Sequence, residues 1–166
     1  MEQPTAITVR VPATSANLGA GFDCLGLALD LFASITVTFT GAEQPPTEDV
    51  GEKMVLTAIR QAYQRMGKQP PAGIRALHNV AIPLGRGLGA SAVARVAGIV
   101  AANEYERHPL SEAAVLDLAS ELEGHGDNAC PALFGGMQVC VQSSSANFVH
   151  VPCRFPQDAA IAILIP

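Results

Sequence analysis

Aromatic and charged side chains are scarce in this sequence. It has no tryptophan, two tyrosines and six phenylalanines, and Asp, Glu, Lys and Arg together make up only 15% of its 166 residues. Lysine and arginine form no cluster and the net charge is −5, so nucleic acid is not an expected partner. With 49% hydrophobic residues the chain is too apolar for a disordered protein, and we expect one domain with a real core.

Membrane spans and cysteine motifs are missing as well. No uninterrupted apolar run is long enough to cross a bilayer, no signal peptide is evident, and the four cysteines form no C-x-x-C pair. These cysteines are Cys24, Cys130, Cys140 and Cys153. The absences favour reduced, mostly buried thiols in a cytoplasmic protein without a membrane partner.

Hydrophobic periodicity predicts strands and helices in mixed order. Strands are expected at 7–11, 33–40, 74–80, 137–141 and 148–151, and helices at 53–66, at 90–102 and from Ser111 onward. A loop of small residues is expected at 12–21, ahead of an apolar stretch at 22–31. The apolar segment 159–165 is expected to be a buried strand, which would make the domain look cut rather than finished. Paired strands mixed with helices indicate an α+β fold built on a layered mixed sheet.

Three glycines, at positions 85, 87 and 89, precede the helix expected from Ala90. Glycine is needed where the backbone turns with positive φ or comes close to a ligand. The N-terminus of a helix offers unpaired N–H groups and the positive end of the helix dipole, which suit phosphate. The segment is therefore predicted to be a cradle for nucleotide phosphates. The candidate binding residues are Pro83, Leu84, Gly85, Arg86, Gly87, Leu88, Gly89, Ala90, Ser91, Ala92 and Val93.

Other loops share this glycine pattern. A plain connecting loop remains open as an alternative. Gly85-x-Gly87-x-x-Ala90 also fits the dinucleotide fingerprint of dehydrogenases, but that fingerprint follows a buried strand directly, and Pro83 intervenes here. A Walker A loop is excluded because no lysine follows Gly89.

A carboxylate stands in apolar surroundings near the N-terminus. Asp23 lies between Phe22 and Cys24, a position poorly suited to a solvated surface. Buried carboxylates persist only when they are paired or used, which favours a functional role for Asp23. Asn17, in the small-residue loop before it, is equally suited to capping a turn.

The densest polar cluster is Glu123-Gly124-His125-Gly126-Asp127-Asn128. The helix that begins near Ser111 brings Glu121 and Glu123 to its C-terminal end, where the helix dipole disfavours a carboxylate. An acid placed against its local preference points to a nearby cation.

Phosphoryl transfer needs a phosphate cradle, a magnesium site made of oxygen ligands, and groups that align an acceptor. Ser91, in the first turn of the cradle helix, and Glu123 are the candidate metal ligands. The candidate acceptor-positioning residues are Asn17, Asp23, His125, Asp127 and Asn128.

At these residues the sequence resembles the GHMP kinases, and within them the members that phosphorylate homoserine. Residues 83–93 are similar to the family's P-x-x-x-G-L-G-S-S-A phosphate loop. Residues 11–26 resemble the N-terminal signature of the homoserine-phosphorylating members, and residues 123–128 with 131–136 resemble their middle signature. The three matches occur in the family's order, and they cover about the first half of a typical member.

The resemblance implies a fold, a reaction and a set of ligands. Residues 1–166 would form the N-terminal ATP-binding domain, a ribosomal protein S5 domain 2-like fold with helices on one face of the sheet. ATP and Mg²⁺ would be the cofactors, and the reaction would phosphorylate the side-chain hydroxyl of homoserine to O-phosphohomoserine in threonine biosynthesis. A homodimer stays open.

Residue roles follow from the same resemblance. Ser91 and Glu123 would hold magnesium, Asn17 and Asp23 would bind the backbone groups of the amino acid, and His125, Asp127 and Asn128 would lie near its side-chain hydroxyl. Other GHMP kinases place a general base where Asn128 stands. Since Asn cannot take the proton, the resemblance implies catalysis chiefly by alignment and charge neutralisation, with Ser91, Glu123 and Asn128 as the catalytic residues.

The sequence departs from the family pattern in four places. Ala90 replaces the first serine of the loop, Gly126 replaces a Pro or Ala and is expected to loosen its turn, and Lys53-Met54 stands where an Asn-Leu pair near the nucleoside is expected. The resemblance also implies a C-terminal domain, which these 166 residues are not expected to contain. Two alternatives therefore stay open beside the homoserine kinase reaction, a truncated nucleotide-binding module without catalysis and another GHMP small-molecule kinase.

Overall fold

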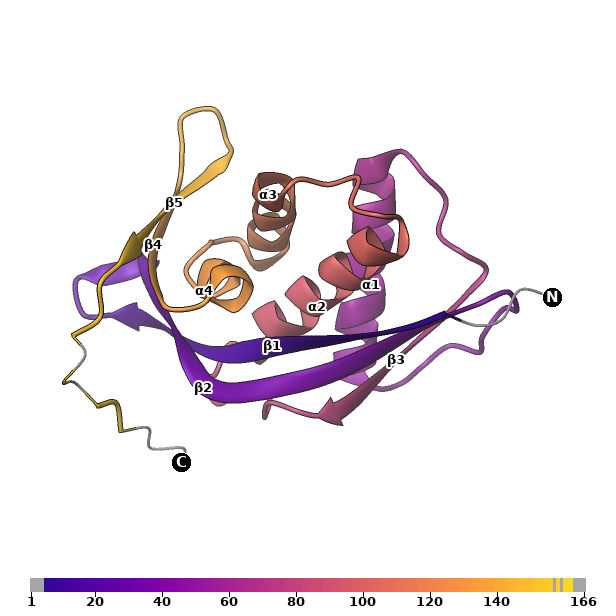
Figure 1. The fold of residues 1–166 in the computed structure, drawn as a ribbon, viewed down its shortest axis with the longest axis horizontal. Helices are drawn as coiled ribbons and strands as arrows, with labels where there is room; N and C mark the ends of the chain where they lie inside the picture. The colour runs from indigo at the N-terminus through magenta and orange to yellow at the C-terminus, as the bar shows by residue number, and fades with distance from the viewer. Residues whose placement is uncertain (1–4, 157, 159, 163–166) are drawn as a thin grey trace.

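A long β-hairpin is the frame of the fold. In the computed structural model, which describes residues 5–156, 158 and 160–162, β1 (Thr5–Leu18) and β2 (Gly21–Thr40) pair antiparallel over their full length. Figure 1 shows the hairpin running across the molecule beneath the helices. Other strands pair with it, and helices pack against it.

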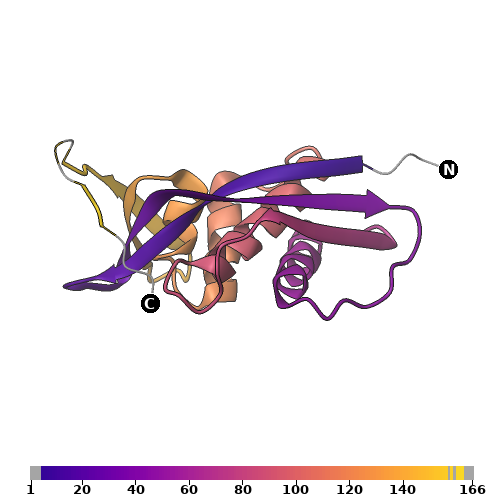
Figure 2. The same ribbon diagram turned by 90° about the horizontal axis from the view of Figure 1, so that it is seen from below.

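Three shorter strands complete the sheet. They are β3 (Gly73–Val80), β4 (Met137–Gln142) and β5 (Phe148–Cys153). β3 pairs with the C-terminal half of β2, so that β1, β2 and β3 run side by side (Figure 2). β4 pairs with β2 at residues 25–27, and β5 pairs with β4. All of these pairings are antiparallel, so the α+β class is confirmed and the sheet is antiparallel where a mixed one was expected.

The hairpin changes register twice on the way to its turn. The pairing shifts between Pro12 and Thr14 and again between Ala16 and Leu18, and each shift places extra residues on β2. Such bulges bend a strand and increase its twist. Gly26 lies between them, where a Cβ atom would sit 1.7 Å from the carbonyl oxygen of Asp127. The hairpin thus reaches the loop that precedes α4 by direct backbone contact.

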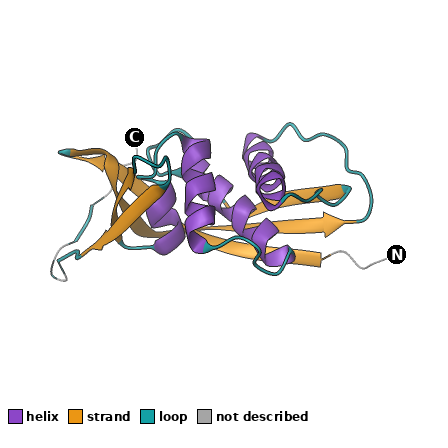
Figure 3. Ribbon diagram, turned by 90° about the horizontal axis from the view of Figure 1, so that it is seen from above, coloured by secondary structure: helices purple, strands orange, loops and turns teal. Residues whose placement is uncertain are grey.

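Helices cover one face of the sheet (Figures 1 and 3). They are α1 (Val50–Met66), α2 (Ala90–Tyr105), α3 (Glu112–Glu123) and the short α4 (Ala129–Phe134). The core lies between the layers, where Ile35 and Val37 of β2 meet Ile59 of α1 and Val96 and Ile99 of α2, all nearly or fully buried. Each such side chain contributes about 1.5–3 kcal/mol through burial. None of the helices among the described residues has the length and apolarity needed to cross a bilayer.

Local signals define the helix ends. The Asp49 side chain caps α1 by accepting a hydrogen bond from the Glu52 N–H at 2.6 Å, and Gly67 ends the helix in the left-handed conformation. Ser111 caps α3 by accepting from the Ala114 N–H at 3.2 Å. The three helices expected from the sequence are confirmed, to within a few residues at each end.

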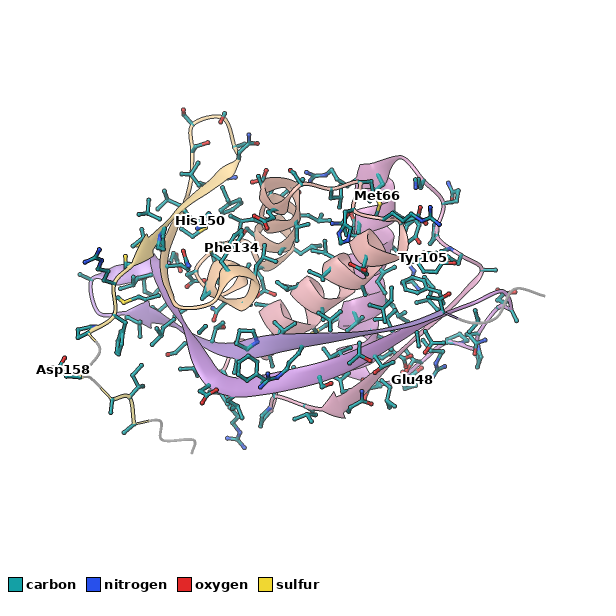
Figure 4. The ribbon with its side chains drawn as sticks, in the orientation of Figure 1. Glu48, Met66, Tyr105, Phe134, His150 and Asp158 are labelled. Atoms are coloured by element: carbon teal, nitrogen blue, oxygen red, sulfur yellow. The ribbon has the colours of Figure 1, made fainter. Side chains whose placement is uncertain are left out.

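The scarce aromatic rings are used to join elements. Phe39 of β2 stacks on Tyr105 at the end of α2, with ring centroids 4.0 Å apart. Phe134 of α4 stacks on His150 of β5 at 4.2 Å, and Figure 4 shows the two side chains next to each other. The second stack ties the β4–β5 hairpin to the helical layer.

Two expectations about local structure are wrong, and one helix was not expected. Residues 12–18 continue β1 because they pair with β2, which leaves only a tight turn at 19–20 where a long loop was expected. α4 was not expected at all, since six residues are too few to show helical periodicity. Residues 160–162 are exposed and form no strand, while 159 and 163–165 of that expected strand lie outside the described residues.

Candidate functional site

The cradle has the backbone conformation that its glycines suggested. Gly85, Gly87 and Gly89 all have left-handed φ angles, of 70°, 68° and 65°. α2 begins directly after Gly89, which carries no side chain to cap the helix. At Gly89 a Cβ atom would also lie 1.9 Å from Thr14 Oγ1. The left-handed φ angle and the lack of room for a Cβ atom therefore both require glycine there, at the start of a helix whose first N–H groups have no partner within the helix.

Thr14 of β1 joins the cradle to the polar cluster. Its backbone N–H donates to the Leu88 carbonyl at 3.1 Å, and its hydroxyl donates to Asn128 Oδ1 at 2.7 Å. The residue is fully buried. This role of Thr14 was not expected from the sequence, although the residue lies within the signature at 11–26. Nothing in the local sequence around Thr14 indicates a hydrogen bond to Asn128, which lies 114 positions further along the chain.

The two candidate metal ligands lie together. The Ser91 hydroxyl donates to Glu123 Oε2 at 3.0 Å, and the Glu123 side chain is only 8% exposed. The other carboxylate oxygen, Oε1, forms an ion pair with the guanidinium of Arg95. The sequence analysis missed Arg95, although its spacing of four residues from Ser91 on one helix was a readable signal of a shared face.

His125, Asp127 and Asn128 form a second polar group beside Glu123. Asp127 is fully buried, and its Oδ1 accepts from the Asn128 N–H at 2.8 Å and contacts His125 Nδ1. Its Oδ2 is buried without a hydrogen-bond partner among the described residues. From its buried position Asp127 therefore orients His125 and Asn128, while His125 stays partly exposed.

Asn17 and Asp23 face each other across the end of the β1–β2 hairpin. Both adopt left-handed φ angles, of 59° and 55°, and Asn17 Oδ1 accepts a hydrogen bond from the Asp23 N–H at 2.9 Å. The expectation that Asp23 is shielded from solvent is wrong, because the side chain is exposed. The tight turn carries residues 22–24 away from the core, which the apolar neighbours in the sequence did not reveal.

An open hollow of about 600 Å³ collects most of the candidate residues. Its lining comprises Ala16, Asn17, Val50, Met54, Leu84, Gly85, Gly87, Leu88, Gly89, Ala90, Ser91, Glu123, His125 and Asn128. Seven of the eleven cradle candidates, Ser91 among them, and four other candidate residues thus contribute to one surface. Ala92 and Val93 are buried in the core instead, and Pro83 and Arg86 are exposed beside it. Asp23 and Asp127 are not part of the lining.

The departures from the family pattern have visible surroundings. Met54 lines the hollow, whereas Lys53 pairs with Glu48 on the surface at 2.7 Å. Gly126 is buried, and a Cβ atom there would lie 2.3 Å from Cys140 Sγ, so the packing of β4 requires glycine. The looser turn expected at Gly126 stays a prediction. The cysteines are all free thiols, as expected, and two of the four are buried.

The oxygen donors in the hollow fit magnesium better than a metal held by protein alone. Among the described residues, no three His, Cys, Asp or Glu side chains gather in a metal-binding group. The Ser91 hydroxyl and Glu123 Oε2 are two hard oxygen atoms placed side by side. Mg²⁺ usually takes one or two protein oxygens and completes its shell with substrate phosphates and water. The donor set therefore suits a cation that arrives with a nucleotide.

Comparison with known families decides the affiliation of the chain. The family model described as "GHMP kinases N terminal domain" matches residues 53–136, just over half of the chain. The matched segment contains the cradle, Ser91, Glu123 and the cluster up to Asn128. The chain belongs to the GHMP kinase family.

Individual relatives agree with this affiliation. The chain is 41% identical to a homoserine kinase of Nostoc punctiforme over 179 aligned residues, which cover 100% of this GHMP kinase chain and 57% of the relative. Among solved structures, a homoserine kinase from Cytophaga hutchinsonii has a TM-score of 0.75 at 28% identity, over 91% of this chain and 52% of that one. A putative homoserine kinase from Listeria monocytogenes has a TM-score of 0.68 at 33% identity, over 92% and 55%.

This GHMP kinase chain spans just over half the length of the curated relatives it matches.

Proposed function

We propose that this chain is the ATP-binding part of a homoserine kinase, which transfers the γ-phosphoryl group of ATP to the side-chain hydroxyl of L-homoserine. The product would be O-phosphohomoserine, an intermediate of threonine biosynthesis in the cytoplasm. The observation that carries the proposal is the meeting of the glycine cradle, the Ser91–Glu123 pair and Asn128 on one open hollow. The names of the relatives, homoserine kinases 36–41% identical to the chain, support the choice of acceptor.

The cradle would bind the ATP phosphates. Its backbone turns three times through left-handed glycines and then presents the N-terminus of α2, where N–H groups and the helix dipole favour negative charge. Ala90 contributes no hydroxyl here. One phosphate hydrogen bond, worth about 0.5–1.5 kcal/mol, would be missing relative to a cradle with two serines.

Ser91 and Glu123 would hold the Mg²⁺ that accompanies ATP. The ion would supply positive charge that neutralises the phosphates as the bond to the leaving group breaks. Ser91 and Glu123 provide neighbouring oxygen ligands on one side of the hollow, which fixes where the phosphates can lie. The protein's part is thus to place the phosphates in line with the acceptor.

Asn17, Asp23, His125, Asp127 and Asn128 would place homoserine. Asn128 cannot accept the hydroxyl proton, and its Oδ1 is already engaged by Thr14. Its Nδ2 also donates to Asp127 Oδ1 at 3.3 Å, and the second amide hydrogen is suited to orienting the acceptor oxygen. Phosphoryl transfer through a loose transition state needs little help from a base, so alignment by these groups is sufficient in principle. The exposed Asp23 would meet the substrate ammonium.

One observation favours a second candidate. The matches cover only 56% and 57% of two relatives. The site is therefore also compatible with a unit that binds nucleotide but does not catalyse phosphoryl transfer by itself. A mevalonate kinase of Methanococcus jannaschii has a TM-score of 0.68 at only 15% identity. This likeness shows a shared fold and gives no reason to propose an acceptor other than homoserine.

Calorimetric titration tests the proposal. The chain would be titrated with a non-hydrolysable ATP analogue in the presence of Mg²⁺, with and without homoserine. We expect nucleotide binding that homoserine strengthens. In Ser91→Ala we expect the affinity for the Mg²⁺–nucleotide to fall roughly tenfold, because one oxygen ligand is lost.

Ser145→Ala, in the exposed turn between β4 and β5, is the matched control and should bind as the original chain does. Unchanged magnesium dependence in Ser91→Ala would refute its role. A folded chain that binds no nucleotide would refute the proposal for these 166 residues. Nucleotide binding that is indifferent to homoserine would favour the second candidate.

A further inference from the structure

Glu123 occupies a position that disfavours a carboxylate. It is the last residue of α3, at the negative end of the helix dipole, and only 8% of its side chain is exposed to solvent. A carboxylate taken out of water needs a partner of opposite charge. In the structure that partner is the guanidinium of Arg95, which forms an ion pair with Glu123.

The two oxygens of Glu123 have different partners from different sides. Ser91 holds Oε2 at 3.0 Å, and both residues line the cradle hollow. Arg95, one helical turn further along α2, holds Oε1 and lines an adjoining hollow with Val50, Lys53, Met54, Thr57, Ala58 and Leu122. A cation that enters the cradle hollow therefore meets Oε2 and the Ser91 hydroxyl without displacing Arg95.

We infer that Arg95 is the resident counter-ion of Glu123, a positioning residue that turns Oε2 toward the hollow and prevents a free divalent cation from binding there. This inference rests on the proposed phosphotransferase function. With Arg95 in place, the pair carries no net charge, and a divalent cation gains little by approaching it. The phosphates of a nucleotide restore the missing negative charge, so that the metal is taken up only together with the nucleotide.

The Coulomb energy between neighbouring charges gives the size of the expected change in cation binding. Unit charges a few ångströms apart near a protein surface interact strongly enough to change a binding constant tenfold or more. Removing the positive charge of Arg95 should therefore convert Ser91 and Glu123 into a site for a free divalent cation. A residue that only supported the fold would not produce this gain.

Free Mn²⁺ is the probe, and its binding to the 166-residue chain without nucleotide can be followed by the loss of its free electron paramagnetic resonance signal. We expect weak binding by the original chain and at least tenfold tighter binding by Arg95→Met. The gain should vanish in the double variant Arg95→Met/Glu123→Gln. Arg95→Lys, which keeps the charge, should bind as weakly as the original chain.

Arg65→Met is the matched control, because Arg65 forms an ion pair with Glu121 of the same helix α3 at 2.6 Å. It removes the same charge and the same type of pair, and free Mn²⁺ binding should not change. If Arg95→Met does not fold, Arg95→Gln takes its place in the same titration. Unchanged or weaker Mn²⁺ binding in the folded variant would overturn the inference.

This measurement contains no nucleotide, so it separates the inference from the proposed function. Tight nucleotide binding combined with no gain of free Mn²⁺ in Arg95→Met would overturn only the role of Arg95. A gain of free Mn²⁺ in a chain that binds no nucleotide would uphold the counter-ion and overturn the proposed function.

Discussion

Thr14 is the side chain on which the two halves of the candidate site depend. Its backbone supports the cradle at Leu88, and its hydroxyl holds Asn128. Substitution by valine keeps the shape and the backbone bond but leaves Asn128 Oδ1 without its donor. The two contacts can therefore be separated by experiment.

In Thr14→Val we expect homoserine binding to weaken more than nucleotide binding. The lost hydrogen bond and the unpaired acceptor should cost about 1–2 kcal/mol, mainly at Asn128. Calorimetry with each ligand in turn measures both affinities. Thr14→Ser restores the hydroxyl and should recover most of the loss. Equal loss for both ligands, or no recovery in Thr14→Ser, would mean that Thr14 only supports the fold.

At the residue scale, the sequence is sufficient where the type of a side chain alone indicates its chemistry. Ser91 and Glu123 were selected as a pair of oxygen ligands, and the structure brings them into hydrogen-bond contact. Their proposed role in binding metal stays a prediction. Asp23 was expected to be shielded because its sequence neighbours are apolar, yet exposure depends on how the hairpin turns.

At the element scale, α1 and α2 cross at a glycine. Gly98 is buried, and a Cβ atom there would lie 2.6 Å from the Val55 carbonyl oxygen and 3.0 Å from Ala58 Cβ. In an exposed helix, alanine is better than glycine by about 1 kcal/mol. The contact with a backbone carbonyl, which cannot move aside alone, should outweigh that gain.

We expect Gly98→Ala to lower the free energy of unfolding by about 1–3 kcal/mol through overpacking. Urea denaturation gives the value. Gly41→Ala is the matched control, since nothing lies within 4 Å of its added Cβ atom, and it should change stability by less than about 0.5 kcal/mol. A Gly98→Ala variant more stable than the original chain would show that helix propensity decides at this crossing.

Periodicity located most elements but not the course of the long hairpin. The segment 12–18 is made of small residues without strict alternation, and it forms a strand only because β2 pairs with it through two register shifts. The backbone at Gly26 likewise depends on a distant contact, because it packs directly against the backbone of Asp127, 101 positions further along the chain. Contacts of this kind lie outside any local window of sequence.

At the scale of the whole molecule, pH acts on the ends of α1 and α2 through Glu106. Its carboxylate accepts hydrogen bonds from Lys68 and from Tyr63 Oη, the latter at 2.9 Å. The bond from Lys68 lowers the pKa of Glu106, with Tyr63 adding to the effect and burial opposing it. Burial and the bond to Glu106 raise the pKa of Tyr63.

A carboxylate whose pKa is lower in the folded state stabilises the fold above the pKa it has when unfolded, near 4.3. That contribution is lost as the pH falls through the lowered folded value. We therefore expect urea unfolding free energies to fall more steeply below about pH 4 in the original chain than in Lys68→Met. Lys53→Met, which breaks the exposed pair with Glu48, should follow the original chain. Parallel curves for Lys68→Met and the original chain would contradict this role of Lys68.

The sequence by itself determined the α+β class, the glycine cradle at the start of α2, and the nature of the candidate chemistry. Glycine conformations, helix caps and oxygen ligands are properties of single residues and their near neighbours, so they can be read in order along the chain. The tertiary structure decided that Arg95 and Ser91 share Glu123, that Thr14 holds Asn128, and that Asp23 is exposed. The first two features join positions far apart in sequence, which the packing of the hairpin against the helices brings together, and the exposure of Asp23 depends on how the hairpin turns.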